Sequence, residues 1–142
     1  MPMQQLEKQR DDSQSTPPAS EPATILVVDD DAPICRLLDL YLTAFGYRVL
    51  LASDGEKAVE IAHKHPEIRL AILDVVMSGL CGQRLAEELT IALPGVAVLF
   101  SSGHPTATVS RLGIDLRSAH FLQKPCPAPE LKRKIQEMLP TR

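Results

Sequence analysis

Short apolar runs alternate with longer amphipathic stretches along the chain from Thr24 onward. Several of these runs are continuous rather than alternating, which is typical of parallel strands that are covered on both faces of a sheet. Five strands are therefore predicted, at residues 25–28, 48–52, 70–73, 96–100 and 119–122.

The stretches between these runs have the spacing of amphipathic helices. In the first, apolar residues from Ile34 to Leu42 recur on one helix face, and Asp31 is expected to cap that helix. Ser53 and Glu56 form an S-x-x-E capping box for the second helix. The predicted helices span residues 33–45, 56–65, 83–93, 106–112 and 129–139.

Five β–α units within residues 24–142 predict an α/β domain with a doubly wound, five-stranded parallel sheet. We expect right-handed crossovers and the flavodoxin-like strand order 2-1-3-4-5. Residues 1–23 hold four of the chain's twelve prolines and few apolar residues, so they are predicted to form a disordered tail or linker. No G-x-G-x-x-G follows the first strand, so the fingerprint of dinucleotide binding is missing.

Composition narrows the class of protein further. The 142 residues include 15 Lys and Arg against 18 Asp and Glu, for a formal net charge of −3. This balance argues against a nucleic-acid-binding domain and against a polybasic membrane-surface module. No apolar run approaches the roughly 20 residues that span a bilayer, and the polar N-terminus lacks a secretory signal. We therefore expect a cytoplasmic domain whose cysteines, Cys35, Cys81 and Cys126, are reduced because they form no C-x-x-C pair.

Polar residues collect where the predicted strands end. Asp29 and Asp30 follow the first strand, Asp74 the third, Ser101 the fourth and Lys124 the fifth. Because the carboxyl ends of parallel strands share one edge of the sheet, these side chains are expected to meet in one small cleft. Each type alone is common in caps, turns and solvated faces, but the four separate strand ends together indicate a site.

The residue types in this cleft favour phosphoryl chemistry. Neighbouring carboxylates repel one another, and a divalent cation such as Mg²⁺ relieves that repulsion by taking oxygen ligands. Lys124 offers a compact cation for a phosphoryl oxygen, and Ser101 offers a hydroxyl donor. The protein's part in such chemistry is positioning and charge stabilisation.

At these residues the chain resembles a receiver domain of the response-regulator family of two-component and phosphorelay signalling. The resemblance implies the (βα)5 receiver fold over residues 24–142 and a regulatory, non-enzymatic role that includes self-phosphorylation and slow self-dephosphorylation. The segments that carry it are ILVVDDD (25–31), LAILDVVMSGLCG (70–82), VLFSS (98–102) and FLQKP (121–125).

The resemblance implies a role for each acidic residue of the cleft. Asp74 corresponds to the phosphoacceptor, whose carboxylate attacks a phosphohistidine. Asp29 and Asp30 correspond to the acidic pair that holds Mg²⁺ or Mn²⁺, and the metal also takes an oxygen of Asp74 and the backbone carbonyl of Val76. The phosphodonor is a histidine kinase or a histidine phosphotransfer protein.

The remaining residues of the cleft correspond to the responding part of a receiver. Lys124 matches the lysine that pairs with the phosphoryl group, and Pro125 after it matches a cis proline. Ser101 matches the switch hydroxyl and Phe121 the switch aromatic ring. Their readout is the face formed by the fourth helix, fifth strand and fifth helix, which binds a downstream protein or a second copy, with no direct contact to nucleic acid or membrane.

Some positions depart from the family's usual residues. Ser78 stands where proline is common, and Phe121 replaces a frequent tyrosine. Neither Val76 nor Gly103, at positions that tune water attack in this family, carries a group that orients water. We therefore hypothesise a comparatively long-lived phosphoryl state.

Two other functions compete with this interpretation. A phosphohydrolase of the haloacid-dehalogenase type would use Asp29 as nucleophile and Asp31 as acid/base, but it expects Gly-Thr where this chain has Ala32 and Pro33, and it leaves Asp74 unused. A receiver-like interaction module without phosphorylation is disfavoured because the acids, the acceptor and the lysine are all present. A stand-alone receiver and the terminal receiver of a hybrid kinase both remain open.

Overall fold

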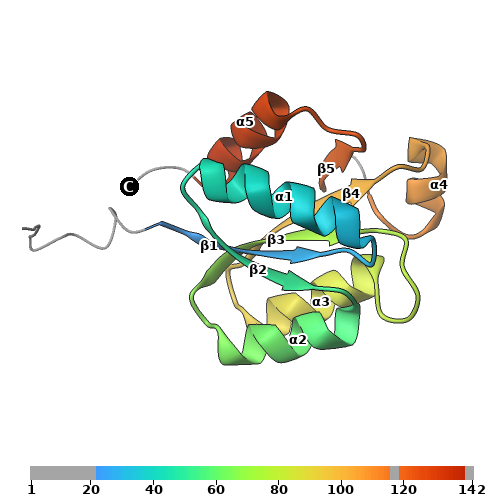
Figure 1. Cartoon of the computed structure of the whole chain (residues 1–142). Helices are drawn as coiled ribbons and strands as arrows, with labels where there is room; N and C mark the ends of the chain where they lie inside the picture. Colours follow the sequence, from blue (N-terminus) through green and yellow to red (C-terminus); the bar gives the residue numbers. More distant parts are fainter. Residues whose placement is uncertain (1–21, 116–118, 140–142) are drawn as a thin grey trace, which may run out of the picture.

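The computed structural model describes residues 22–115 and 119–139, in which strands and helices alternate in chain order (Figure 1). Residues 1–21 of the tail predicted at residues 1–23 lie outside this part of the chain. None of the described helices is long and apolar enough to cross a membrane. The elements are β1 (Thr24–Val28), α1 (Ala32–Ala44), β2 (Arg48–Ala52), α2 (Gly55–Lys64), β3 (Ile68–Asp74), α3 (Gly82–Ala92), β4 (Ala97–Ser102), α4 (Thr106–Arg111), β5 (His120–Gln123) and α5 (Ala128–Met138).

The strands form one parallel sheet in the order β2-β1-β3-β4-β5, which confirms the predicted doubly wound α/β fold. Helices α1 and α5 cover one face of this sheet, and α2 and α3 cover the other (Figure 1). β1 and β3 are central and entirely buried apart from one half-buried residue, Arg69. β5 lies at the edge and is only four residues long.

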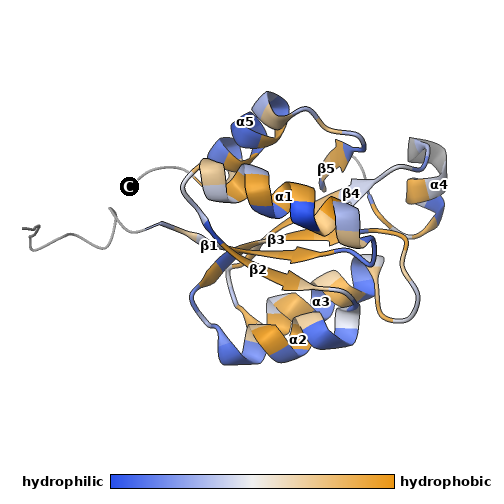
Figure 2. Ribbon diagram, viewed as in Figure 1, coloured by the Kyte–Doolittle hydropathy of each residue, from blue (hydrophilic) through white to orange (hydrophobic). Residues whose placement is uncertain are grey.

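The sheet separates two apolar clusters. Alternate residues of β1 enter different clusters: Leu26 packs on the α2 and α3 side, and Ile25 packs on the α1 and α5 side with Leu131 and Ile135. The central part of β1 and β3 is therefore continuously apolar, and the middle of the sheet is mostly hydrophobic in Figure 2. This two-sided burial explains why the sequence pattern of the strands is continuous.

Helix caps show one prediction confirmed and one wrong. Asp31 caps α1, because its carboxylate accepts a hydrogen bond from the backbone N–H of Ile34 at 3.2 Å. The predicted Ser53 capping box does not form; Asp54 caps α2 instead and accepts from Lys57 N–H at 2.7 Å. Both residue types can cap a helix, but a carboxylate is the stronger acceptor for an N-terminal N–H.

The carboxyl ends of two strands lie further along the chain than predicted. β3 includes Asp74 and β4 includes Ser101 and Ser102, because Asp74 pairs with Ser101 in the ladder between these strands. Asp74 and Ser101 thus belong to the sheet itself, whereas Asp29, Asp30 and Lys124 directly follow their strands. The backbone positions of Asp74 and Ser101 are consequently set by strand pairing.

Candidate functional site

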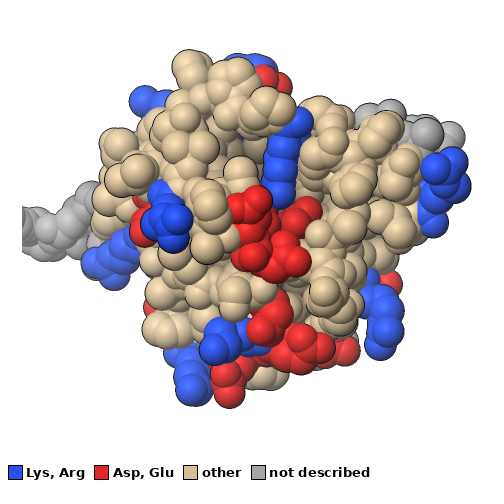
Figure 3. Space-filling view, turned by 45° about the vertical axis from the view of Figure 1, so that its right-hand side comes forward, with Lys and Arg blue, Asp and Glu red and all other residues tan. Residues whose placement is uncertain are grey.

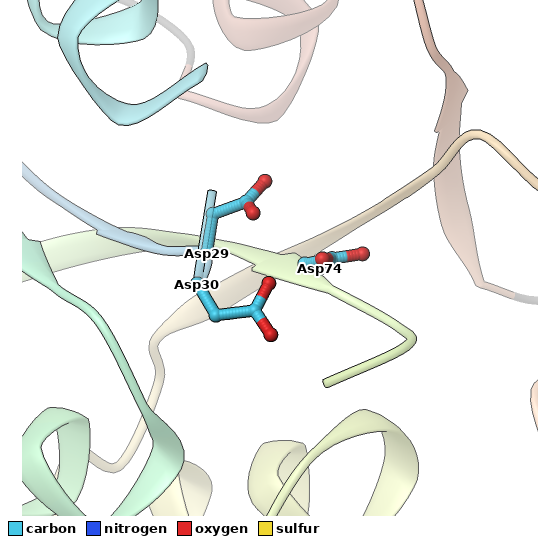
Figure 4. A group of neighbouring side chains, drawn as sticks. All are labelled: Asp29, Asp30 and Asp74. Atoms are coloured by element: carbon cyan, nitrogen blue, oxygen red, sulfur yellow. The ribbon is translucent and has the colours of Figure 1, made fainter. Parts of the chain in front are cut away.

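Three carboxylates meet at the carboxyl ends of β1 and β3 (Figure 4). Asp29, Asp30 and Asp74 each offer an oxygen atom, and these atoms lie within 4.8 Å of one another. Asp29 and Asp74 are buried, whereas Asp30 is exposed. Acidic side chains accordingly gather at the centre of the molecular face shown in Figure 3.

Asp29 is held in place by its backbone and by neighbouring groups. Its N–H donates to the carbonyl of Ala52 at 3.2 Å, and its Oδ1 accepts from Asp31 N–H at 3.0 Å. The Cys35 thiol, buried on α1, donates to the Asp29 carbonyl at 3.2 Å. Nothing in the residue spacing distinguishes Cys35 from an ordinary core residue, so this contact cannot be predicted from the sequence.

Lys124, the residue directly after the edge strand β5, reaches the carboxylate cluster with its side chain. Its Nζ lies 2.7 Å from Asp29 Oδ2 and 3.7 Å from Asp74 Oδ1. The Lys124–Pro125 peptide bond is cis, as expected. One lysine therefore stands against three carboxylates, and its closer partner is Asp29.

The environment of Asp74 disfavours its charge. Burial and the neighbouring carboxylate of Asp29 raise the pKa of Asp74 to about 6, while the Lys124 ammonium and a hydrogen bond from Val76 N–H, at 3.3 Å, act in the opposite direction. The local excess of negative charge is the kind that a divalent cation offsets.

Ser101 and Phe121 lie on neighbouring strands but on opposite faces of the sheet. Ser101 is buried beside Asp74 in the ladder and lines a cavity on the α1 side. Phe121 is half-buried and packs against the cluster on the α2 and α3 side. The structure therefore brings Ser101 to the carboxylates but leaves Phe121 on the far face.

A cavity of about 340 Å³ opens between α1 and the segment after β5. Ser101 and Lys124 line it together with apolar side chains, so it adjoins the carboxylate cluster. Leu37 of α1, which also lines the cavity, exposes 42% of its area, and Leu40, which is not part of the lining, exposes 70%. The remaining lining residues are Ile34, Leu38, Tyr41, Ile72, Leu122, Pro125, Cys126 and Pro127.

Comparison with known proteins decides the family. The response regulator receiver domain matches residues 25–136, which include every member of the cluster. The chain belongs to the response-regulator receiver family. Receiver domains are regulatory domains that bind Mg²⁺ at an acidic pocket and interact with histidine kinases and phosphotransfer proteins.

Relatives of this receiver domain occur in several kinds of protein. It is 36% identical over 118 residues to the response regulator GtcR of Aneurinibacillus migulanus, a match that covers 82% of this chain and 47% of GtcR. The transcriptional regulatory protein GlrR of Escherichia coli is 29% identical, with 84% of this chain and 27% of GlrR covered. The chain thus spans about half the length, or less, of these relatives.

Solved structures agree with this assignment. The receiver domain of the hybrid histidine kinase CckA is 32% identical, with a TM-score of 0.70, and the match covers 82% of this chain and 98% of that one. A response regulator receiver domain protein from Clostridium thermocellum is 28% identical with a TM-score of 0.73, over 82% and 94% of the two chains.

The donor set fits the metal that receiver domains bind. Mg²⁺ prefers hard oxygen ligands and usually takes only one or two carboxylates besides water and phosphate. Asp29, Asp30 and Asp74 supply such oxygens at one point of the sheet edge. Asp31, which the hydrolase hypothesis needs as an acid/base, is instead engaged at the N-terminus of α1.

Proposed function

We propose that Asp74 accepts a phosphoryl group from a phosphohistidine of a histidine kinase or phosphotransfer protein. The observation that supports this most is the position of Asp74 at the end of the central strand, next to two further carboxylates and 3.7 Å from the Lys124 ammonium. An Asp74 oxygen forms the bond to phosphorus, the phosphorus–nitrogen bond breaks, and the leaving imidazole keeps the electron pair and takes a proton.

In this proposal the other side chains position and neutralise charge. Asp29, Asp30, Asp74 and the backbone carbonyl of Val76 would hold Mg²⁺ or Mn²⁺, whose charge offsets that of the incoming phosphoryl group. Lys124 is close enough to both buried carboxylates to turn toward a phosphoryl oxygen on Asp74. Self-phosphorylation by a small phosphodonor and slow self-dephosphorylation belong to the same proposal.

The response follows from the new anion. Ser101 moves its hydroxyl toward a phosphoryl oxygen and Phe121 changes its packing, which together alter the face of α4, β5 and α5. That face then binds a downstream protein or a second copy of the domain. The net charge of −3 favours proteins over nucleic acid or membrane as direct partners, consistent with a cytoplasmic location.

The phosphodonor protein approaches along the cavity beside α1. A donor histidine must reach Asp74, and the apolar cavity, whose lining includes the exposed Leu37, adjoins that approach. Apolar surface of this kind is suited to burial against a partner helix. Whether the donor is a separate kinase or the kinase part of a longer chain makes no difference to this contact.

The domain organisation is also part of the proposal. We infer a receiver domain that begins at Thr24, the first residue of β1, after a linker over residues 1–23. The family match over residues 25–136 supports this boundary. A chain that begins at Thr24 is expected to take up phosphoryl groups as fast as the full chain.

The decisive experiment measures covalent phosphorylation. The full chain is incubated with acetyl phosphate and Mg²⁺, and intact mass spectrometry is expected to show one added phosphoryl group that Asp74→Asn does not acquire. Asp39→Asn is the matched control, because Asp39 is a half-buried carboxylate on α1 that accepts a hydrogen bond from the Thr43 hydroxyl and is not part of the carboxylate cluster. Uptake by Asp74→Asn equal to that of the wild type contradicts the proposal, and dependence on Asp29 with turnover of the donor supports the hydrolase instead.

A further inference from the structure

The side chain of Gln123 links β5 to the loop after β4. Its Nε2 donates to the carbonyl of Ser102 at 3.2 Å and to the carbonyl of His104 at 3.0 Å. Gln123 itself is exposed, so these two bonds, rather than burial, hold its side chain against the loop. Two N–H groups of one amide thus bridge two points of the chain 19 and 21 residues away.

The segment that Gln123 holds follows Ser101 in the chain and contacts Lys124. Ser102 follows Ser101, is fully buried, and its carbonyl also accepts the backbone N–H of Lys124 at 2.8 Å. Its hydroxyl accepts His104 N–H at 2.9 Å. A Cβ on Gly103 would lie 3.9 Å from Lys124 Cβ, so the loop rests against the lysine.

This bridge is placed to connect groups that do not face one another. Ser101 and Phe121 lie on opposite faces of the sheet, so a displacement of one reaches the other through the backbone of β4 and β5. Gln123 follows Phe121 by two residues and precedes Lys124. The two carbonyls that Gln123 holds belong to the segment that directly follows Ser101, so a displacement of this segment would lengthen or break these hydrogen bonds.

We propose that Gln123 is a positioning residue that holds the β4–α4 loop in the unphosphorylated arrangement, an inference that rests on the proposed function. In the described structure the Lys124 ammonium is closer to Asp29 than to Asp74, so it would have to turn to reach a phosphoryl oxygen on Asp74. The bonds of Gln123 belong to this arrangement and oppose the switch. Their removal shifts the equilibrium toward the phosphorylated-like state and raises the apparent affinity for a phosphoryl mimic.

The test compares beryllofluoride binding, at saturating Mg²⁺, by the full-length wild type, Gln123→Leu and Gln83→Leu. Gln83 is the matched control, an exposed glutamine on α3, outside the face of α4, β5 and α5. Gln123→Leu is expected to bind beryllofluoride roughly three- to tenfold more tightly than the wild type. This range corresponds to the net contribution of one or two hydrogen bonds between uncharged groups. The affinity for Mg²⁺ is expected not to change, because no proposed metal ligand lies on the loop.

Amide spectra separate positioning from a general loss of structure. Without beryllofluoride, the signals of residues 102–104 in Gln123→Leu should move toward their positions in the beryllofluoride complex of the wild type. Gln123→Met, which is as long as glutamine but has no N–H group, is expected to behave in the same way. Equal or weaker beryllofluoride binding by both variants overturns the role of Gln123, whereas failure of the wild type to bind beryllofluoride overturns the proposed function itself.

Discussion

The acidic part of the site, at the ends of β1 and β3, lies in the middle of the sheet. Ser101 on β4, Phe121 on β5 and Lys124 directly after β5 lie toward one edge. β1 is entirely buried, and the backbone of Asp29 is bonded to β2 and α1. β5 has four residues, two of them exposed, and α4 has six. The central half of the site, at the ends of β1 and β3, therefore holds charge in a fixed geometry. The edge half, formed by β4, α4 and β5, has the lower local stability that a response requires.

The largest expected difference between the central and the edge half is in how much a core substitution lowers the free energy of unfolding. Leu73→Ala, on the central strand, is expected to lower the free energy of unfolding by about 3–5 kcal/mol, since its side chain is completely buried and the sheet cannot collapse around the gap. Leu122→Ala on β5 should lower it by about 2 kcal/mol, because the edge can relax. Urea denaturation measures both, and equal losses would show that the edge is as rigid as the centre.

The next effect concerns metal binding by the central half. Asp29→Asn is expected to weaken Mg²⁺ binding by at least about tenfold, since it removes one charge of the cluster and a partner of Lys124. Asp31→Asn is the control, because asparagine caps a helix as well as aspartate does. Titration calorimetry compares the two variants, and a similar loss in both would place the metal elsewhere.

The charge of Asp74 gives the central half a pH dependence. Since its pKa in the folded protein is about 6, well above the ordinary value of an aspartate, the folded state binds the proton more readily than the unfolded state. Metal-free stability should therefore fall as the pH rises from about 4 to 6 and be level above that range, by about 1–3 kcal/mol in total. Asp74→Asn should remove this slope and be the more stable protein at pH 7.

Urea denaturation in a chelator at several pH values measures this slope. Asp39→Asn serves again as the control and should keep it, because Asp39 lies on the surface of α1 away from the cluster. A wild-type stability that rises between pH 4 and 6 contradicts the assignment of the raised pKa to Asp74.

The smallest expected effect is on the lifetime of the phosphoryl group, which depends on water beside Val76. Val76 is 38% exposed beside Asp74 and carries no polar side-chain group, so the phosphoryl state is expected to last minutes or longer. Val76→Asn should shorten it several-fold by orienting a water molecule. Loss of label after removal of the phosphodonor measures the lifetime, with Ile91→Asn on the exposed side of α3 as control. A wild-type half-life of seconds is the contrary result.

Much of the fold could be predicted because it depends on local pattern. Continuous apolar runs identify each strand, and helical spacing identifies each helix between them. The errors lie at the ends: Asp74 and Ser101 extend their strands because they pair with each other, and Asp54 replaces Ser53 as a cap. Such choices are made between nearly equivalent residues by contacts that the local pattern does not contain.

The site was predictable in composition but not in its internal contacts. Strand ends predict that Asp29, Asp74 and Lys124 meet, since parallel strands share an edge. The sequence does not show that Lys124 lies nearer Asp29 than Asp74. It also does not show that the Gln123 side chain reaches the carbonyls at the end of β4 and in the loop after it. Those distances depend on how far each strand extends and on how the loops return.

The sequence by itself determined the alternation of strands and helices, and hence a parallel sheet with acids, a hydroxyl and a lysine at one edge, because periodicity and strand polarity are local properties of the chain. Only the tertiary structure decided the raised pKa of Asp74, the placement of Ser101 and Phe121 on opposite faces, and the Gln123 bridge. These features require burial and contact between segments remote in the chain, and their energies depend on distances that packing alone sets.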